Sequence, residues 1–386
     1  MTLCDKSIAA DLIILGGGCA GLSLASRLAD QDEAMRVVVV ESRRSYEEDR
    51  TWCGWRTGPH FFSDCVKREW HEWQVVTPGG TFRRGSQRYS YELIKSDCFY
   101  EKACRVLSNS RSANLILGTQ AREVSENESG VVVTLADGRS LQAPWVVDTR
   151  PQPRVLEQPW LWQNFVGYVV DFAGDCNCFS NDIPTLMDFQ PADGSVAQFV
   201  YLLPLTANSY LCEWTQLSPK RSHLPLIEAR LVKWLGQQAG SGWRVSRRES
   251  GCLPMALPLE ERRKRVVSAG MRGGSMRASS GYAFHAIQRW AEACTSAMQT
   301  TGRPIAPLRN RLLEALDAGF LRVLHQKPAP AADIFGRLFS DCEPDHLVRF
   351  LAGIPQSDDY WPVIRSLPWS RFLPTVPQVV STWCKA

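Results

Sequence analysis

The sequence predicts an α/β fold in which a parallel sheet is interrupted by an inserted antiparallel sheet and followed by a helical C-terminal segment. Three observations along the 386 residues lead to this prediction. A glycine frame follows an apolar run near the N-terminus. Short β-branched and aromatic runs fill the middle of the chain, and a strand, a glycine loop and a helix return after them. Apolar residues make up 44% and charged residues 22% of the chain, as in ordinary globular proteins.

The N-terminal stretch DLIILGGGCAGLSLASRL has the pattern of a strand, a tight turn and a helix. We expect a buried strand over residues 8–15, a turn over 16–21, a helix over 22–29 and a second strand over 37–40. This is the length of one βαβ unit.

The glycines of this stretch stand in a G-x-G-x-x-G frame. Gly16 permits the tight turn, Gly18 lets the backbone approach a pyrophosphate, and Gly21 lets the helix pack closely on the strand. Glu41 ends the second strand, where a carboxylate can accept hydrogen bonds from an adenosine ribose. We therefore predict a Rossmann-type dinucleotide site.

The following segments predict the rest of the fold. The stretch from Tyr89 to Leu107 is expected to turn into an amphipathic helix, with Leu93, Phe99 and Cys104 on one face. A hairpin is expected at Asp137-Gly138, ahead of a strand that ends near residue 148.

We predict three regions from these patterns. Residues 1–75, 100–160 and 260–306 form a discontinuous FAD-binding domain, residues 76–99 and 161–259 a β-rich substrate domain, and residues 307–386 a helical C-terminal segment.

FAD is favoured over NAD because a second glycine loop, SAGMRGGSMRASSGYAF, follows the β-rich insertion. It supplies a second anion cradle, with Ser279 or Ser280 as the expected N-cap of the next helix; a merely flexible loop is the alternative. The predicted cofactor-binding residues are Gly16, Gly18, Cys19, Ala20, Gly21, Glu41, Asp148, Gly270, Gly273, Gly274, Ser280, Gly281 and Tyr282.

Composition argues against several classes of protein. A net charge of +4 from 44 basic and 40 acidic residues is too balanced to indicate a nucleic-acid partner. Thirteen cysteines without a C-x-x-C pair favour a reducing compartment over a disulfide framework or zinc site. The chain contains no run of about 18 apolar residues, so we predict no membrane span. The six histidines lack the spacing of metal ligands. We therefore expect a cytoplasmic protein without a metal.

Several motifs together resemble the flavin-dependent lycopene cyclases of carotenoid biosynthesis. They are the glycine frame, VVDTRP, WQNFVGYVV, PTLMDF, FVYLLPLTANSYLCEWT, ESGCLPM, GGSMRASSGYAF and an aromatic tail, and they extend over nearly the whole chain. The resemblance implies a glutathione-reductase-like FAD fold, reduced flavin supplied by NADPH, association with the inner face of a membrane, and cyclisation of a lycopene-like carotenoid to β-ionone rings. It places an essential carboxylate at Glu213. Trp214 stands where relatives often have a second acidic residue, and Arg277-Ala278 where many have His-Pro or Lys-Pro.

Cyclising a polyene end needs a proton for a terminal alkene and a dry site for the resulting cation. A carboxyl group buried among apolar residues suits the first step, because burial keeps it protonated near neutral pH. We expect Glu213 to be that acid. The other candidate catalytic or pocket residues are Asp188, Trp214, Tyr201, Phe199 and Glu249.

Two alternative functions stay open at this point. One is an aromatic-ring monooxygenase or halogenase on the same scaffold, and the other a protein that binds FAD and lipid at a membrane without turnover. In the tail, aromatic and aliphatic residues alternate with arginines, which predicts the mouth of a lipid-facing tunnel. The tail residues concerned are Phe320, Leu321, Leu324, Phe335, Leu338, Phe339, Leu347, Phe350 and Leu351, with Arg322, Arg337 and Arg349.

Overall fold

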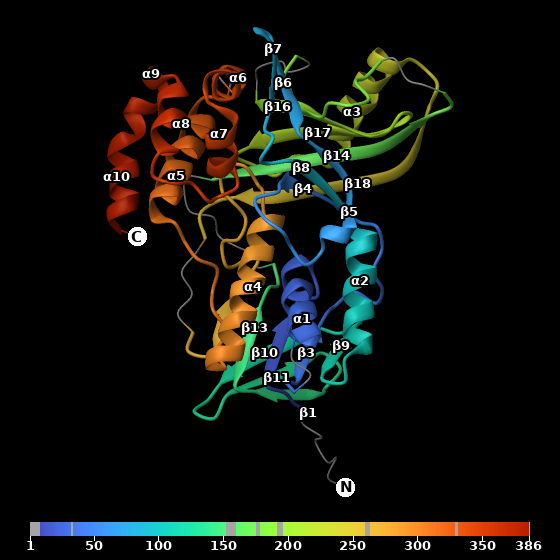
Figure 1. Cartoon of the computed structure of the whole chain (residues 1–386), viewed down its shortest axis with the longest axis vertical. Helices are drawn as coiled ribbons and strands as arrows, with labels where there is room; N and C mark the ends of the chain where they lie inside the picture. Colours follow the sequence, from blue (N-terminus) through green and yellow to red (C-terminus); the bar gives the residue numbers. More distant parts are fainter. Residues whose placement is uncertain are drawn as a thin grey trace.

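The computed structural model describes residues 8–31, 34–151, 160–174, 178–190, 196–258, 263–328 and 331–385. Figure 1 shows helices α1, α2 and α4 around a parallel sheet at one end of the molecule and a large, mostly antiparallel sheet at the other. The C-terminal helices stack beside the large sheet, and the first strand, β1 (Ile8–Ala9), lies at the opposite end of the molecule.

The parallel sheet has the strand order β19-β13-β2-β3-β9. Its central strands are continuous apolar runs because both of their faces are covered, by helices on one side and by a second sheet on the other. Its strands and covering helices are β2 (Leu12–Leu15), β3 (Val37–Val40), β9 (Ala113–Ile116), β13 (Trp145–Asp148), β19 (Val266–Ser268), α1 (Cys19–Gln31), α2 (Ser96–Asn109) and α4 (Phe284–Thr301).

Two smaller sheets flank this layer. One has the order β1-β12-β11-β10 and covers the parallel sheet through a shared apolar core. The other has the order β4-β8-β5. Their strands are β1 (Ile8–Ala9), β10 (Ala121–Glu126), β11 (Val131–Leu135), β12 (Ser140–Ala143), β4 (Thr51–Trp55), β5 (Val66–Trp70) and β8 (Tyr91–Lys95), with the 3-10 turn η1 (Ser63–Cys65) before β5.

The large sheet has the order β18-β14-β17-β16-β15-β6-β7 and is antiparallel except where β15 meets β6. One face packs on α3 and the other faces the middle of the molecule and the C-terminal helices. Successive residues of a strand point to opposite faces, so this arrangement decides the environment of each side chain. The elements are β6 (Glu72–Thr77), β7 (Gly80–Gly85), β14 (Leu161–Phe172), β15 (Thr185–Asp188), β16 (Ala197–Thr206), β17 (Ser209–Ser218), β18 (Trp243–Met255) and α3 (Leu224–Ala239).

The tail is helical, as expected, and its helices between Arg311 and Ser366 contribute buried apolar side chains to the core that they share with the large sheet. The elements are α5 (Arg311–Gln326), α6 (Ala331–Asp341), α7 (Pro344–Leu351), α8 (Tyr360–Ser366), α9 (Trp369–Phe372), η2 (Leu373–Thr375) and α10 (Val376–Lys385). Among the described residues, no helix combines the length and hydropathy that crossing a bilayer would require.

One local prediction is confirmed: the hairpin joins β11 to β12, with Gly138 at a φ of +89° that suits glycine. The bounds of the N-terminal elements differ from those expected. The strand expected over residues 8–15 is broken after Ala9, so that β1 and β2 join different sheets, and the helix expected over 22–29 spans Cys19–Gln31.

One local prediction is wrong: Leu93 lies in β8, not on the helix, because β8 pairs with β4 on one side and β5 on the other. The helix begins only at Ser96.

Candidate functional site

The glycine turn between β2 and α1 has the geometry of an anion cradle. Gly16 has a φ of +98°, and a Cβ atom there would lie 2.7 Å from the Thr149 hydroxyl oxygen. A Cβ atom at Gly21 would overlap the carbonyl oxygen of Gly16. Gly21 lies inside α1, and the absence of a side chain there allows the close packing that the sequence predicts. Gly18 immediately precedes the helix.

Glu41 reaches back to this turn from the end of β3. Its carboxylate accepts a hydrogen bond from the Gly17 N–H at 2.6 Å and one from the Arg43 N–H at 2.9 Å. Burial would raise the pKa of Glu41, but the hydrogen bonds from Arg43 and Gly17 outweigh burial and lower it. A charged carboxylate thus lies beside the glycine turn, where the sequence predicts a ribose contact.

The second glycine loop lies against the first. Gly270 has a φ of +63°, and a Cβ atom there would approach the side chain of Ala20 in α1 at 2.9 Å. The loop ends at Gly281, after which α4 begins at Phe284 with Ala283 as its N-cap and without a side-chain cap.

The predicted serine N-cap is wrong. The Ser279 hydroxyl instead donates to Asp317 at 2.8 Å, and the buried Ser280 hydroxyl has no hydrogen-bond partner among the described residues.

A cavity of about 920 Å³ extends from the glycine turn to the inner face of the large sheet. Both glycine loops contribute to its walls, and strands β14, β16, β17 and β18 form its far end. The predicted site residues that line it are Gly16, Gly18, Cys19, Ala20, Glu41, Phe199, Tyr201, Glu213, Glu249, Gly270, Ser280, Gly281 and Tyr282.

The remaining predicted site residues do not line this cavity. Trp214 points to the opposite face of β17, where it packs with Ile227 and Leu231 of α3, because neighbouring strand residues alternate faces. Asp188 is half-buried at the end of β15 and accepts a hydrogen bond from the Gln190 N–H. Gly273 and Gly274 shape the second loop.

Asp148 is fully buried and forms ion pairs rather than a cavity wall. Its carboxylate lies 2.7 Å from Arg150 and 2.6 Å from Arg272. These two arginines do line the cavity. The sequence VVDTRP left open whether Asp148 contacts the cofactor or pairs with Arg150, whereas Arg272 was not predicted.

Two carboxyl groups, Glu213 on β17 and Glu249 on β18, meet across β14. Gly167 is the β14 residue that pairs with both in the sheet register. A Cβ atom at Gly167 would lie 3.2 Å from Cγ of Glu249 and 3.4 Å from Cβ of Glu213. The glycine therefore leaves room for two acidic side chains on the cavity side of the sheet.

The two carboxyl groups have different partners. The Glu213 side chain, 9% exposed, accepts one hydrogen bond from the Thr215 hydroxyl at 2.6 Å. Burial, and then the charge of Glu249, raise the pKa of Glu213 to about 8. Glu249 accepts from the Thr51 hydroxyl at 2.9 Å and from Arg247 at 2.8 Å. Burial raises the pKa of Glu249, whereas Arg247 and Thr51 oppose that effect. Within the part of the chain that the structure describes, Glu213 is thus the carboxyl group of this pair without a cation partner.

Aromatic rings form the wall beside these carboxyl groups. The Tyr91 hydroxyl lies 2.7 Å from that of Tyr201 and 3.2 Å from that of Tyr282. Trp55 packs edge-on against the rings of Tyr91 and Tyr282. Burial raises the pKa values of all three tyrosines, so they stay neutral. Tyr91 and Trp55 were not predicted, because they come from β8 and β4, far from the recognisable motifs.

A second, smaller cavity of about 150 Å³ lies among the C-terminal helices. Ser279, Ser280, Phe335 and Leu351 line both cavities, so the two adjoin. Of the predicted tail residues, Phe320, Phe335, Leu338, Leu347, Phe350 and Leu351 line the smaller cavity.

Two of the three tail arginines named in the sequence analysis pair with carboxylates, and the third, Arg322, is half-buried. Arg349 is buried and pairs with Asp359. Arg337 pairs with Asp333 at 3.0 Å within α6.

Arg277 joins the second glycine loop to the tail. Its guanidinium lies 2.9 Å from the Asp317 carboxylate of α5 and 4.3 Å from the centre of the Phe350 ring. Both charged side chains are almost fully buried. Arg277, which departs from the His-Pro or Lys-Pro pattern of many relatives, therefore has an ion-pair partner in this chain, Asp317.

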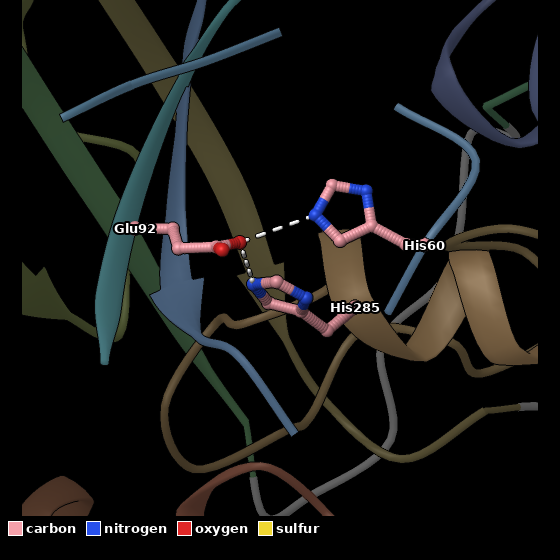
Figure 2. A group of neighbouring side chains, drawn as sticks. All are labelled: His60, Glu92 and His285. Atoms are coloured by element: carbon pink, nitrogen blue, oxygen red, sulfur yellow. Dashed lines mark hydrogen bonds and ion pairs between the residues drawn. The ribbon is translucent and has the colours of Figure 1, made fainter. Parts of the chain in front are cut away.

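Two of the six histidines lie close together in space. His60 and His285 both approach the buried carboxylate of Glu92, outside the large cavity (Figure 2). The sequence did not indicate this cluster, because its members come from distant segments.

Known proteins resemble this chain in sequence. A family model described as lycopene cyclase protein matches residues 11–375. A lycopene beta-cyclase of Pseudescherichia vulneris is 26% identical over 334 residues, covering 82% of both chains. A chloroplastic lycopene beta cyclase of Arabidopsis thaliana is 23% identical over 298 residues, covering 72% of this chain and 58% of the plant protein.

Solved structures confirm the predicted fold class. A geranylgeranyl bacteriochlorophyll reductase-like protein of Thermoplasma acidophilum has a TM-score of 0.63 at 10% identity, over 98% of this chain and 100% of its own. A p-nitrophenol 4-monooxygenase of Pseudomonas putida has a TM-score of 0.60 at 15% identity, over 95% and 98%. The chain therefore shares its fold with flavin-dependent reductases and monooxygenases.

Proposed function

Because the chain belongs to the lycopene cyclase family, we propose that it cyclises the linear ends of lycopene, or of a related acyclic carotenoid, to β-ionone rings. The reaction is an isomerisation, or intramolecular lyase reaction, without net oxidation. The observation that carries this proposal is the buried carboxyl group of Glu213, which has no cation partner among the residues described, in a large cavity that also reaches a dinucleotide-type glycine turn.

We propose FAD as the cofactor. The features that support it are the glycine turn at Gly16, the carboxylate of Glu41 beside that turn, and the second loop at Gly270 packed on the first. Arg150 and Arg272 add positive charge to the cavity wall. Reduced FAD, with NADPH as the electron source, would supply negative charge and an aromatic surface near a cationic substrate.

Glu213 is the proposed proton donor to the terminal alkene. A carboxyl group whose pKa is raised to about 8 by burial and by Glu249 is mostly protonated at neutral pH. The Thr215 hydroxyl holds one of its oxygens in place.

The aromatic wall suits the cation that proton transfer would create. Phe199, Tyr201, Tyr282 and Trp55 line the cavity beside Glu213. Ring faces attract cations electrostatically, and the attraction is strongest where water is excluded. The hydroxyl contacts of Tyr91 hold two of these rings in position.

The last step is loss of a ring proton. Once Glu213 has donated its proton, the pair Glu213 and Glu249 is one proton short and can accept the proton that the ring loses. The protein then returns to its starting state, with no net gain or loss of protons. Arg247 and Thr51 hold Glu249 on the other side of Gly167.

The test is incubation of the purified protein with lycopene, FAD and NADPH without oxygen. The expected product is a cyclic isomer of unchanged mass. Glu213→Gln should abolish its formation while keeping bound FAD, whereas the control Glu228→Gln on α3 should retain activity. Full activity in Glu213→Gln would rule out the proposed acid.

The same experiment separates the two alternative functions. A product that needs oxygen and has gained mass would indicate a monooxygenase or halogenase. Lycopene that binds and is recovered unchanged would indicate a carrier.

We also propose that the tail rests on the cytoplasmic face of a membrane and takes up carotenoid there. Exposed apolar side chains gather on the last helices, and three of them, Trp369, Leu373 and Val376, also line the smaller cavity. That cavity adjoins the larger one, which supports an apolar route from the surface to Glu213. The exposed set is Trp361, Trp369, Leu373, Val376, Val380 and Trp383.

Flotation of the full-length protein with lipid vesicles tests this surface. Replacing Trp361 and Trp383 together by serine should reduce the floated fraction. Leu308→Ser removes a side chain that is 94% exposed outside this set and should leave flotation unchanged. Equal flotation of both variants would contradict the proposal.

A further inference from the structure

Three side chains from separate parts of the chain converge outside the lining of the large cavity (Figure 2). His60 precedes η1, Glu92 lies on β8, and His285 lies in the first turn of α4. His60 Nε2 is 3.1 Å and His285 Nε2 is 3.7 Å from the same carboxylate oxygen, Oε2 of Glu92. All three ligand atoms lie within 4.8 Å of one another.

The cluster is closed to solvent and its polar atoms are not fully paired. His60, Glu92 and His285 are 8%, 0% and 9% exposed. His285 Nε2, which faces the carboxylate, and His60 Nδ1 have no hydrogen-bond partner among the described residues. Buried polar atoms are normally paired, so an unpaired nitrogen beside a carboxylate points to a missing cation.

Neighbouring arginines do not supply that cation at Oε2. Arg56 lies 3.1 Å from the other oxygen of Glu92, Oε1, and is shared with Glu69 at 3.4 Å. Arg289 donates to the Thr57 hydroxyl and to a backbone carbonyl. One guanidinium is therefore divided between two carboxylates, and no arginine of the described residues pairs with the oxygen that faces the imidazoles.

We propose that His60, Glu92 and His285 bind a divalent transition-metal ion of the zinc type. Two imidazole nitrogens and one carboxylate oxygen are a donor set found in zinc sites. Bonds of roughly 2.0–2.1 Å in a tetrahedron place neighbouring ligand atoms about 3.3 Å apart. The distances from Glu92 Oε2 to the Nε2 atoms of His60 and His285, 3.1 and 3.7 Å, are close to that spacing. Water would complete the coordination.

One further contact of His285 supports this donor set. Its hydrogen bond to the backbone of Gly54 would orient the ring, as outer hydrogen bonds commonly do for metal-binding histidines. A magnesium or calcium ion would instead prefer oxygen ligands.

The proposed ion would have a structural role. None of its three ligands lines the large cavity. The ion would join β8 and the η1 segment to the start of α4, which follows directly after the cavity residue Tyr282. Binding of the metal does not depend on the proposed cyclase activity.

The experiment measures metal on the full-length purified protein. After chelation and dialysis, zinc or cobalt is added back and the bound metal is counted by mass spectrometry. We expect one equivalent, the absorption bands of tetrahedral cobalt(II), and a higher Tm with zinc. His60→Ala and His285→Ala should each lower the bound metal at least tenfold, whereas His71→Ala should bind as the unmodified protein does.

Metal binding by the unmodified protein tests the proposal even if a variant fails to fold. Less than a tenth of an equivalent of bound zinc or cobalt at micromolar metal would overturn the proposal. Unchanged metal content in the conservative variant Glu92→Gln and in a folded His285→Ala would also overturn it, because the metal would then lie elsewhere.

Discussion

Replacing Glu213 by glutamine should change how the stability of the protein depends on pH. An ordinary glutamic acid titrates at 4.5, whereas burial and the charge of Glu249 raise the pKa of Glu213 to about 8. Between these values the folded chain holds a proton that the unfolded chain releases. The free energy of unfolding therefore falls by about 1.4 kcal/mol per pH unit from this group, or about 5 kcal/mol in total, as the pH rises from 4.5 to 8. Above pH 8 this contribution is constant.

Glutamine has nearly the same shape and does not titrate, so the variant should lose this dependence. Urea unfolding of both proteins at several pH values between 4.5 and 9 measures the difference. The variant should gain stability relative to the unmodified protein as the pH rises to 8. Glu228→Gln, which removes a surface carboxylate paired with Arg248, should show no such gain above pH 5.

The cyclisation rate is the second measurement. The rate should fall as the pH rises through about 8, because ionised Glu213 cannot donate a proton. Parallel stability curves for the unmodified protein and Glu213→Gln between pH 5 and 8 would refute the assignment of a raised pKa to this residue.

Three further predictions concern two tightly packed glycines and one buried ion pair. Gly167→Ala should lower cyclisation at least tenfold, because its Cβ atom would lie 3.2 Å from Cγ of Glu249, displace that side chain and fill the remaining space beside Glu213; Gly236→Ala, with open space around the new atom, should not. Gly21→Ala should weaken FAD binding, measured by fluorescence titration, because the new Cβ atom would overlap the carbonyl oxygen of Gly16. Retained affinity would contradict this reasoning. Arg277→Ala leaves Asp317 buried without its ion-pair partner and should cost about 3–5 kcal/mol in urea unfolding; a loss under 1 kcal/mol would count against that role.

Local sequence patterns were sufficient where local geometry decides the structure. A glycine with positive φ at Gly16 or Gly138, and continuous apolar runs in β2 and β3, are properties of short segments. The predicted helix over Leu93 failed for the opposite reason, because pairing with two strands distant in sequence outweighed its helical spacing.

The family resemblance directed attention to Glu213, but it did not indicate what surrounds that residue. The position of Gly167 between two carboxyl groups depends on the register of three strands. The exclusion of Trp214 from the cavity depends on which face of the sheet α3 covers. Neither relation exists within any short stretch of the chain.

The sequence by itself determined the glycine turn and the fold class, because these follow from short-range backbone preferences, and the family resemblance indicated the candidate acid. Only the tertiary structure decided which side chains share an environment: the pairing of Glu213 with Glu249, the contact of Tyr91 with Tyr201, and the meeting of His60 with His285. The physical reason is that burial and electrostatic interaction act through space, and folding brings together groups that the chain keeps far apart.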